Sequence, residues 1–258
     1  MAALASQLRG AARALLAASW LLVCAADGHA GAAAPAPANQ RWVVAIDVGH
    51  GRSDPGTTSA RGVPEYRFND RLAREVQSAL GAVDVKTLLV NGNGALVGSR
   101  GLDERTRVAN AAHADLLVSI HHDSVQERYL EAWSFKGRSR RYCDRFAGYS
   151  IFYSAGNPQA ERSRRFAELL ADELRVRGLR PSLHHAENID GERRDLIDPA
   201  RGIYRTDFRV IKHSAMPAVL LEAGIIVNRD EEARLAGVRY RKRIVDSVVA
   251  ATIRFREK

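Results

Sequence analysis

Three apolar runs of this 258-residue sequence end in side chains that can bind a metal ion. The three side chains are His50, His121 and Glu222. Each run has the composition of a buried β-strand. In open α/β sheets the ligand crevice lies at the carboxyl ends of the strands. The pattern therefore predicts a polar site at one edge of a sheet.

A fourth candidate, Glu65, opens the helix that we expect to follow the first strand, directly after Pro64. The helix dipole favours an ionised carboxylate in the first turn. Two imidazoles and one carboxylate, with a second carboxylate nearby, are typical of a hydrolytic zinc site that keeps one position open for water. We therefore predict a metal site that includes His50 and Glu65.

The sequence leaves the third ligand and the role of Glu222 open. Successive strand residues point to opposite faces, so only one of His121 and His122 can face the crevice. Glu222 is interpreted as a general base beside metal-bound water. A helix N-cap or a salt-bridged carboxylate is the structural alternative.

Strand and helix patterns alternate from Arg41 onwards. This alternation predicts an α/β fold in which a single domain, residues 41–258, holds a twisted mixed, mostly parallel sheet with helices on both faces. We expect strands at 42–46, 85–90, 116–120, 149–154, 208–211 and 218–221, and helices from Pro64 to Gly81, at 103–112, from Pro158 to Gly178 and through Tyr240 to Phe255.

Two segments fit the alternation poorly, Asp123–Gly148, which is rich in arginine and aromatic residues, and Leu183–Tyr204, which is polar. Both lie just beyond candidate site residues, so they are expected either to rim a cleft as insertions or to be ordinary surface loops.

The first 30 residues have the pattern of a secretory signal: a short basic start, an apolar stretch and small residues near Ala30. A retained N-terminal anchor is the alternative, and Cys24 lies in a poor lipoprotein motif. Residues 31–40 read as a linker. After cleavage we expect no stable membrane span, a periplasmic or otherwise exported protein, and no disulfide, because only Cys143 remains.

The chain is basic, with 39 Lys and Arg against 30 Asp and Glu. Removal of residues 1–30, which hold two basic and one acidic side chain, changes the net charge from +9 to +8. A basic protein attracts polyanions. Export argues against nucleic acid as the partner, so anionic cell-wall polymer is the expected one, with a simply solvated basic surface as the alternative.

From about Trp42 to Phe255 the chain resembles the zinc-dependent N-acetylmuramoyl-L-alanine amidases, which cleave cell-wall peptidoglycan. The resemblance rests on five blocks in order: Asp47–Gly51 with Asp54–Gly56, Gly62–Glu65 with Asn69, Leu102 to Asn110, Ala114–His121, and Pro217–Gly224 with Asn228. It implies the mixed sheet, His50, Glu65 and His121 as Zn²⁺ ligands, and Glu222 as the catalytic acid/base.

The resemblance also selects His121 over His122, because the family normally has a small residue at the next position. His122 is thus a departure from the family pattern, as are Val48, Arg52 and Ala223. None of the departures removes an implied ligand or the acid/base.

The resemblance implies hydrolysis of the amide between the lactyl group of N-acetylmuramic acid and L-alanine, in wall turnover or cell separation. Arg52 or Arg105 is expected to hold stem-peptide carboxylates. Peptidoglycan or soluble muropeptides would be the substrate, with a monomeric enzyme and a protein activator or targeting partner as further expectations.

Three other readings compete. A zinc carboxypeptidase would use the His-x-x-Glu pair of His184 and Glu187, although no strand precedes it. A cysteine hydrolase would use Cys143, but no histidine follows at a telling position. A non-catalytic wall-binding protein would use the positive charge, but binding alone does not require Glu222.

Overall fold

The computed structural model describes residues 42–191 and 193–257, which lie within one structural unit, Gln40–Lys258. The expected export signal and the linker lie outside the described residues. Among the described residues, no helix combines the length and apolar character that a bilayer crossing requires.

Seven strands form one mixed sheet with the order β2-β1-β3-β9-β6-β8-β7. All neighbouring pairs are parallel except β6–β9 and β7–β8. The mostly parallel sheet confirms the predicted α/β fold. The strands are β1 (Val43–Val48), β2 (Lys86–Val90), β3 (Leu116–Asp123), β6 (Ser150–Tyr153), β7 (Asp195–Asp198), β8 (Ile203–Arg205) and β9 (Ala218–Ile225).

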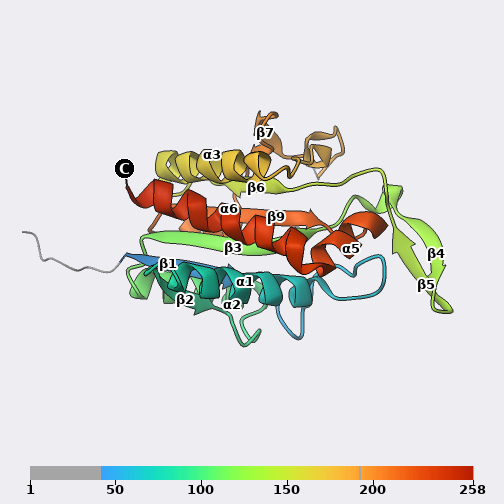
Figure 1. Ribbon diagram of the computed structural model, residues 1–258, viewed down its shortest axis with the longest axis horizontal. Helices are drawn as coiled ribbons and strands as arrows, with labels where there is room; N and C mark the ends of the chain where they lie inside the picture. The colour runs from blue at the N-terminus through green and yellow to red at the C-terminus, as the bar shows by residue number, and fades with distance from the viewer. Residues whose placement is uncertain (1–41, 192, 258) are drawn as a thin grey trace, which may run out of the picture. The chain divides into compact units, whose positions relative to one another are not determined.

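Helices cover both faces of this sheet, as predicted. Figure 1 views the face that carries α6, beside α1 and α3. The opposite face carries α2 and α4, which pack against a second apolar cluster around Leu117 and Phe152. The helices are α1 (Glu65–Gly81), α2 (Gly98–Ala111), α3 (Ala160–Val176), α4 (Arg209–His213), α5 (Arg229–Ala236) and α6 (Val238–Arg256).

Helix α1 shows why the local sequence positions the site. Leu72, Val76 and Leu80 repeat at a spacing of four and are fully buried against the sheet. Pro64 precedes the helix in extended conformation, and its fixed φ suits a residue at a helix start. Burial of this stripe fixes the first turn of α1, which carries Glu65, beside the carboxyl ends of β1 and β3.

The strand predicted at 208–211 is wrong, because these residues enter the short helix α4. Val210 and Ile211 are buried while Lys212 and His213 face outwards. Periodicity alone cannot separate helix from strand in so short an apolar run. Helix α5, which begins after the N-cap Asn228, was not predicted.

The two poorly patterned segments contain structure of their own. Residues 123–148 include the 3₁₀ turn η1 (Glu127–Tyr129) and the antiparallel hairpin of β4 (Glu131–Phe135) and β5 (Arg138–Tyr142), which form a separate two-stranded sheet (Figure 1). Residues 183–204 include the 3₁₀ turn η2 (His184–Ala186) and strand β7.

Candidate metal centre and catalytic cavity

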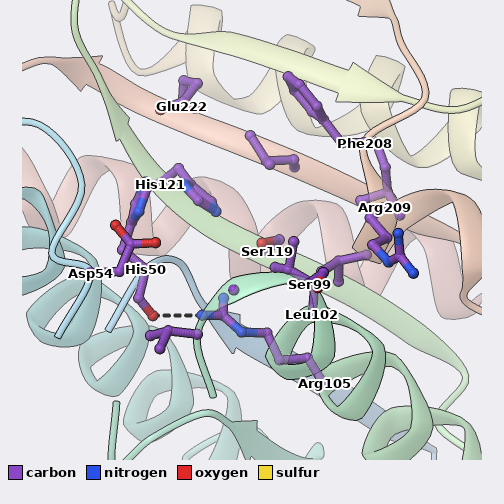
Figure 2. Close-up of a pocket in the computed structure, with 15 residues that line it drawn as sticks. His50, Asp54, Ser99, Leu102, Arg105, Ser119, His121, Phe208, Arg209 and Glu222 are labelled. Carbon is purple, nitrogen blue, oxygen red and sulfur yellow. Dashed lines mark hydrogen bonds between the residues drawn. The ribbon is translucent and has the colours of Figure 1, made fainter. Parts of the chain in front are cut away.

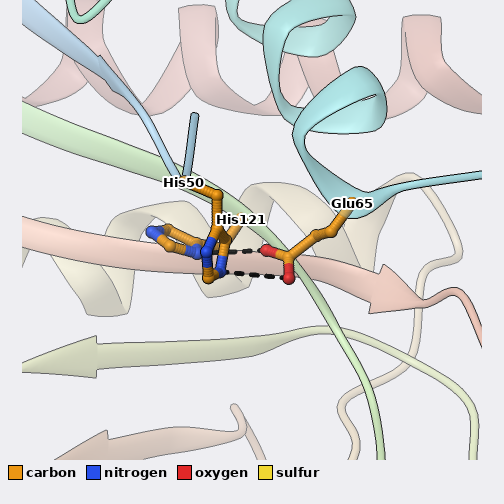
Figure 3. Close-up of side chains that lie close together, drawn as sticks. All are labelled: His50, Glu65 and His121. Carbon is orange, nitrogen blue, oxygen red and sulfur yellow. Dashed lines mark hydrogen bonds and ion pairs between the residues drawn. The ribbon is translucent and has the colours of Figure 1, made fainter. Parts of the chain in front are cut away.

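His50, Glu65 and His121 converge from three separate elements. The Nε2 atom of His50 lies 3.1 Å from Oε2 of Glu65, and Nδ1 of His121 lies 3.2 Å from Oε1 of the same carboxylate (Figure 3). One ligand atom from each residue lies within 4.8 Å of the others. The donor set of two imidazoles and one carboxylate is one that divalent zinc takes in hydrolytic sites.

The turn after β1 presents His50 in a left-handed backbone conformation with φ of 60°. Arg105 from α2 holds this turn, since its guanidinium donates to the carbonyl oxygens of His50 at 2.6 Å and Val48 at 3.0 Å. Asn91 also donates to the His50 carbonyl, at 2.6 Å. The backbone strain at His50 is thus offset by hydrogen bonds from two other elements.

Glycines make room for the three side chains. A Cβ atom at Gly49 would lie 2.4 Å from Nε2 of His121, and one at Gly56 would lie 2.4 Å from Oε2 of Glu65. Both distances are far below van der Waals contact. The glycines therefore allow the backbone to approach the cluster closely.

Polar contacts orient Glu65. The side-chain amide of Asn69 donates to Oε1 at 3.0 Å, and the Thr57 backbone N–H donates to Oε2 at 3.2 Å. Burial by itself would raise the pKa of Glu65, but hydrogen bonds from His121 and His50 outweigh it and hold that pKa well below its usual range. The same pairing outweighs burial at His50 and raises its pKa. Glu65 is therefore an ionised carboxylate.

His122 points away from this cluster. Its Nδ1 atom lies 2.8 Å from Oδ1 of Asn69, and its ring packs against Phe68. Burial lowers the pKa of His122 to about 3, so the imidazole is neutral near pH 7. The strand alternation therefore places His121, and not its neighbour, beside Glu65.

Glu222 lies directly opposite His121 in the parallel ladder of β3 and β9. Both strands continue beyond these residues, so the expected strand ends at His121 and Glu222 are wrong, whereas β1 does end at Val48, just before His50. Burial, followed by the negative charges of Asp123 and Glu65, raises the pKa of Glu222 well above its ordinary value. Its Oε2 atom is buried and has no hydrogen-bond partner among the described residues.

A cavity of about 540 Å³ opens beside these groups. Figure 2 shows His50 and His121 at one end and Phe208 and Arg209 at the other. The volume is in the range of small-molecule sites. The wall combines the polar groups His50, His121 and Glu222 with the apolar side chains Val97, Leu102, Phe208, Ile211 and Leu220.

Arg105 lines the cavity, but its hydrogen bonds do not fit the expectation that it holds substrate carboxylates. Arg105 is 2% exposed, and its guanidinium donates to three backbone carbonyls, those of Val48, His50 and Leu96. Arg52 is exposed and lines a different groove with Arg61 and Arg67. Arg105 is therefore a support of the His50 turn, and Arg52 stays a candidate.

A sequence profile of the N-acetylmuramoyl-L-alanine amidases matches residues 44–254. The chain belongs to this family. Its members are hydrolytic enzymes, and the matched range contains every residue of the metal cluster and the cavity.

Known amidases resemble the chain along most of its length. An N-acetylmuramoyl-L-alanine amidase of Mycobacterium tuberculosis is 26% identical over 91% of this chain and 95% of its own. The solved catalytic domain of an amidase from Paenibacillus polymyxa is 25% identical, with a TM-score of 0.63 over 84% of this chain and 98% of that domain. An amidase structure from Clostridium difficile, 22% identical, shares the fold with a TM-score of 0.66 over 85% of this chain and 99% of its own.

The side chains that a carboxypeptidase or a cysteine hydrolase would use do not form a catalytic site in this amidase. Glu187 pairs with Arg145 at 3.3 Å, whereas His184 lies beside His185 and Asp123, so His184 and Glu187 do not form a metal pair. Cys143 is buried in an apolar cluster with Val125, which is no setting for a nucleophile.

Sequence reasoning did not single out Asp123 as a site residue, although the same alternation that selects His121 reaches it. Ser119, His121 and Asp123 occupy every second position of β3. The negative charge of Asp123 acts on Glu222, so a period-two reading carried to the end of β3 would have found it.

Proposed function

We propose that this family member is a zinc-dependent peptidoglycan amidase that hydrolyses the bond between the lactyl carbonyl of N-acetylmuramic acid and the nitrogen of L-alanine. The observation that carries the proposal is the convergence of His50, Glu65 and His121 beside a cavity that Glu222 also faces. The first three residues would bind Zn²⁺, and Glu222 would act as acid/base.

The residues present fit zinc. Two nitrogen donors and one ionised carboxylate oxygen meet at one point, and glycines leave space around them. Asn69 and Thr57 hold the carboxylate, as partners of metal ligands commonly do. Zinc bound there would supply a Lewis acid, which polarises a carbonyl and lowers the pKa of water towards about 7.

Glu222 moves the proton in this proposal. Its carboxylate takes one proton from the attacking water as the oxygen adds to the lactyl carbonyl carbon. The same carboxyl group then gives the proton to the L-alanine nitrogen as the carbon–nitrogen bond breaks, which leaves a lactyl carboxylate and a free amine. Burial raises the pKa of Glu222, which favours the protonated carboxyl between the two transfers, and a bound Zn²⁺ nearby would favour the ionised carboxylate that first takes the proton.

The substrate and the location follow from the same proposal. The positive charge of the chain suits an anionic cell wall, and the known amidases named above cover most of its length. We propose that residues 1–30 are an export signal, residues 31–40 a linker and residues 41–258 the catalytic domain. The expected activator or targeting partner stays a prediction.

The test compares Glu222→Gln with Glu161→Gln, which changes an exposed glutamate of α3. Each purified protein is incubated with purified peptidoglycan, products are analysed by mass, and bound zinc is counted. Glu222→Gln should keep zinc and lose nearly all release of L-alanine-terminated peptides, while Glu161→Gln should match the parent. Chelation should stop release by the parent. Full activity of Glu222→Gln would disprove its role as acid/base.

A carboxypeptidase differs in its products. It would release the C-terminal residue of the stem peptide and leave the muramoyl–alanine bond intact, so mass analysis of the same digests separates the two reactions. Replacement of His50 and, separately, of His184 then shows which histidine the activity requires.

A further inference from the structure

A second group of metal-binding side chains lies outside the cluster of His50, Glu65 and His121. It consists of Asp123 at the end of β3 and of His184 and His185 in η2. One ligand atom of each lies within 4.8 Å of the others. Two segments that are about 60 positions apart in the sequence therefore bring two imidazoles and one carboxylate to one point.

Both imidazoles lie close to the same carboxylate oxygen. The Nε2 atom of His185 lies 2.7 Å from Oδ2 of Asp123, and Nε2 of His184 lies 3.3 Å from it. The two rings lie side by side with centroids 3.9 Å apart. His185 makes a hydrogen bond to the oxygen. Nε2 of His184 lies close to the same oxygen without a hydrogen bond of good geometry to it, and the backbone of Ser124 is the other polar group beside this ring.

His184 is the decisive residue of the group. It is 2% exposed, so its ring has almost no access to bulk water. Its Nδ1 atom lies 2.9 Å from the hydroxyl oxygen of Ser182. A buried imidazole nitrogen that faces a carboxylate oxygen without a hydrogen bond costs free energy, whereas a cation between the two would satisfy both.

The contacts around these residues resemble the support of a metal ligand. The Ser182 hydroxyl holds the ring of His184 in place, and Ser182 is itself held by its backbone N–H, which donates to the Tyr149 carbonyl at 2.8 Å. His185 packs edge-on against Phe152 and Tyr204. Its side chain keeps 19% exposure, which leaves access for a water molecule as a further ligand.

The donor types select the metal. Imidazole suits zinc and its first-row neighbours, whereas calcium and magnesium prefer all-oxygen sites. Zinc–nitrogen distances of about 2.0–2.1 Å separate tetrahedral ligand atoms by roughly 3.3 Å. The separations of 3.3 and 2.7 Å to Oδ2 of Asp123 thus require only a small opening of the group.

We propose that Asp123, His184 and His185 form a second Zn²⁺-binding site, separate from the cluster of His50, Glu65 and His121. The bound ion ties η2 to the carboxyl end of β3. Because Phe152 contacts both His185 and the cavity residue Phe208, the ion also stiffens one wall of the catalytic cavity.

The test counts zinc bound by the full chain in equilibrium dialysis against ZnCl₂, with metal analysis of the protein. The parent should bind two equivalents. His185→Gln keeps a hydrogen-bond donor towards Asp123 but lacks an imidazole, so it should bind one. His50→Ala should also bind one, and the two changes together should bind none. The control is a double variant of two exposed histidines, His213→Ala and His113→Asn. Asparagine is chosen at 113 because it tolerates the positive φ of that position. This control should bind two equivalents of zinc.

Two results would overturn this site. In the first, the parent binds a single equivalent of zinc, His50→Ala binds none, and His185→Gln still binds one. The other is two equivalents in His185→Gln with its circular dichroism unchanged. The reverse case, a single equivalent that survives His50→Ala and disappears in His185→Gln, supports this site and counts against the proposed catalytic zinc. The two proposals therefore fail separately.

Protection of η2 gives an independent readout. Zinc should slow amide hydrogen exchange at 184–187 in His50→Ala, which has only the second site, and should not slow it when His185→Gln is added. Equal exchange with and without zinc in His50→Ala would contradict the role of the ion in holding η2.

Discussion

His121 and Glu222 are direct neighbours across the parallel ladder of β3 and β9, so their side chains lie on one face of the sheet. The backbone register therefore sets the position of the proposed acid/base relative to a proposed zinc ligand. A slip of one residue would turn either side chain to the opposite face. Buried neighbours such as Ile120 and Leu221 resist that slip, because they would have to exchange faces too.

Gly49→Ala should remove zinc from the cluster of His50, Glu65 and His121. Its new methyl group would lie 2.4 Å from Nε2 of His121 and must displace the ring. The zinc affinity of this cluster, measured by titration, and the rate of peptide release should both fall at least tenfold. Gly81→Ala is the matched control, because no atom lies within 4 Å of its Cβ position. That control should keep activity and gain up to about 1 kcal/mol of stability. Unchanged zinc affinity in Gly49→Ala would contradict the ligand role of His121.

Asn69→Ala should weaken zinc binding without removing a ligand. Asn69 donates to Glu65 and to the Gly49 carbonyl, and its amide oxygen contacts His122. Loss of such a partner typically costs roughly 10- to 100-fold in metal affinity. The unpaired groups should also cost about 1–3 kcal/mol of unfolding free energy. The control is Ser78→Ala, at an exposed position of the same helix. It should change neither the zinc affinity measured by titration nor the free energy measured by urea unfolding.

Arg105→Ala tests whether Arg105 supports the His50 turn or holds substrate. The buried guanidinium joins the His50 turn to α2 and lies 3.5 Å from Asp47. Its removal should lower the unfolding free energy by about 3–5 kcal/mol. Arg105→Lys should recover little, since one ammonium cannot reach the three carbonyls in the same way. If urea unfolding shows no loss and only the KM for muropeptide rises, Arg105 holds substrate instead.

The sequence predicted the parts of this fold that depend on long, regular patterns. The stripe of Leu72, Val76 and Leu80 placed α1 correctly, and the buried run before His121 placed β3. The strand prediction at 208–211 was wrong because two buried apolar residues, Val210 and Ile211, are too few to distinguish a helical period from a strand period.

The candidate site divides in the same way. Residue types, strand ends and a helix start were sufficient to nominate His50, Glu65 and Glu222, whereas the choice of His121 over His122 came from the family resemblance. The burial that makes Arg105 a support, and the approach of His184 to Asp123, depend on tertiary packing between distant segments. No local pattern records such contacts, since Arg105 reads as a surface residue and His184 lies in a polar stretch.

The buried imidazole of His122 should make the stability of the fold depend on pH. Its pKa is about 3 in the fold, and imidazole in the unfolded chain titrates near 6.5. Between these values the unfolded chain binds the proton and the folded chain does not. The contribution of His122 to the unfolding free energy should therefore decrease as pH falls from 6.5 towards 3, by up to about 1.4 kcal/mol per pH unit.

His122→Ala removes this group, so its unfolding free energy should depend less steeply on pH over the same range. The measurement is urea unfolding of the metal-free protein at several pH values, with His213→Ala as the exposed control that keeps the parent slope. The burial of His184 acts in the same direction in every variant and leaves a residual slope. Parallel curves for His122→Ala and the parent would show that His122 does not stay neutral in the fold.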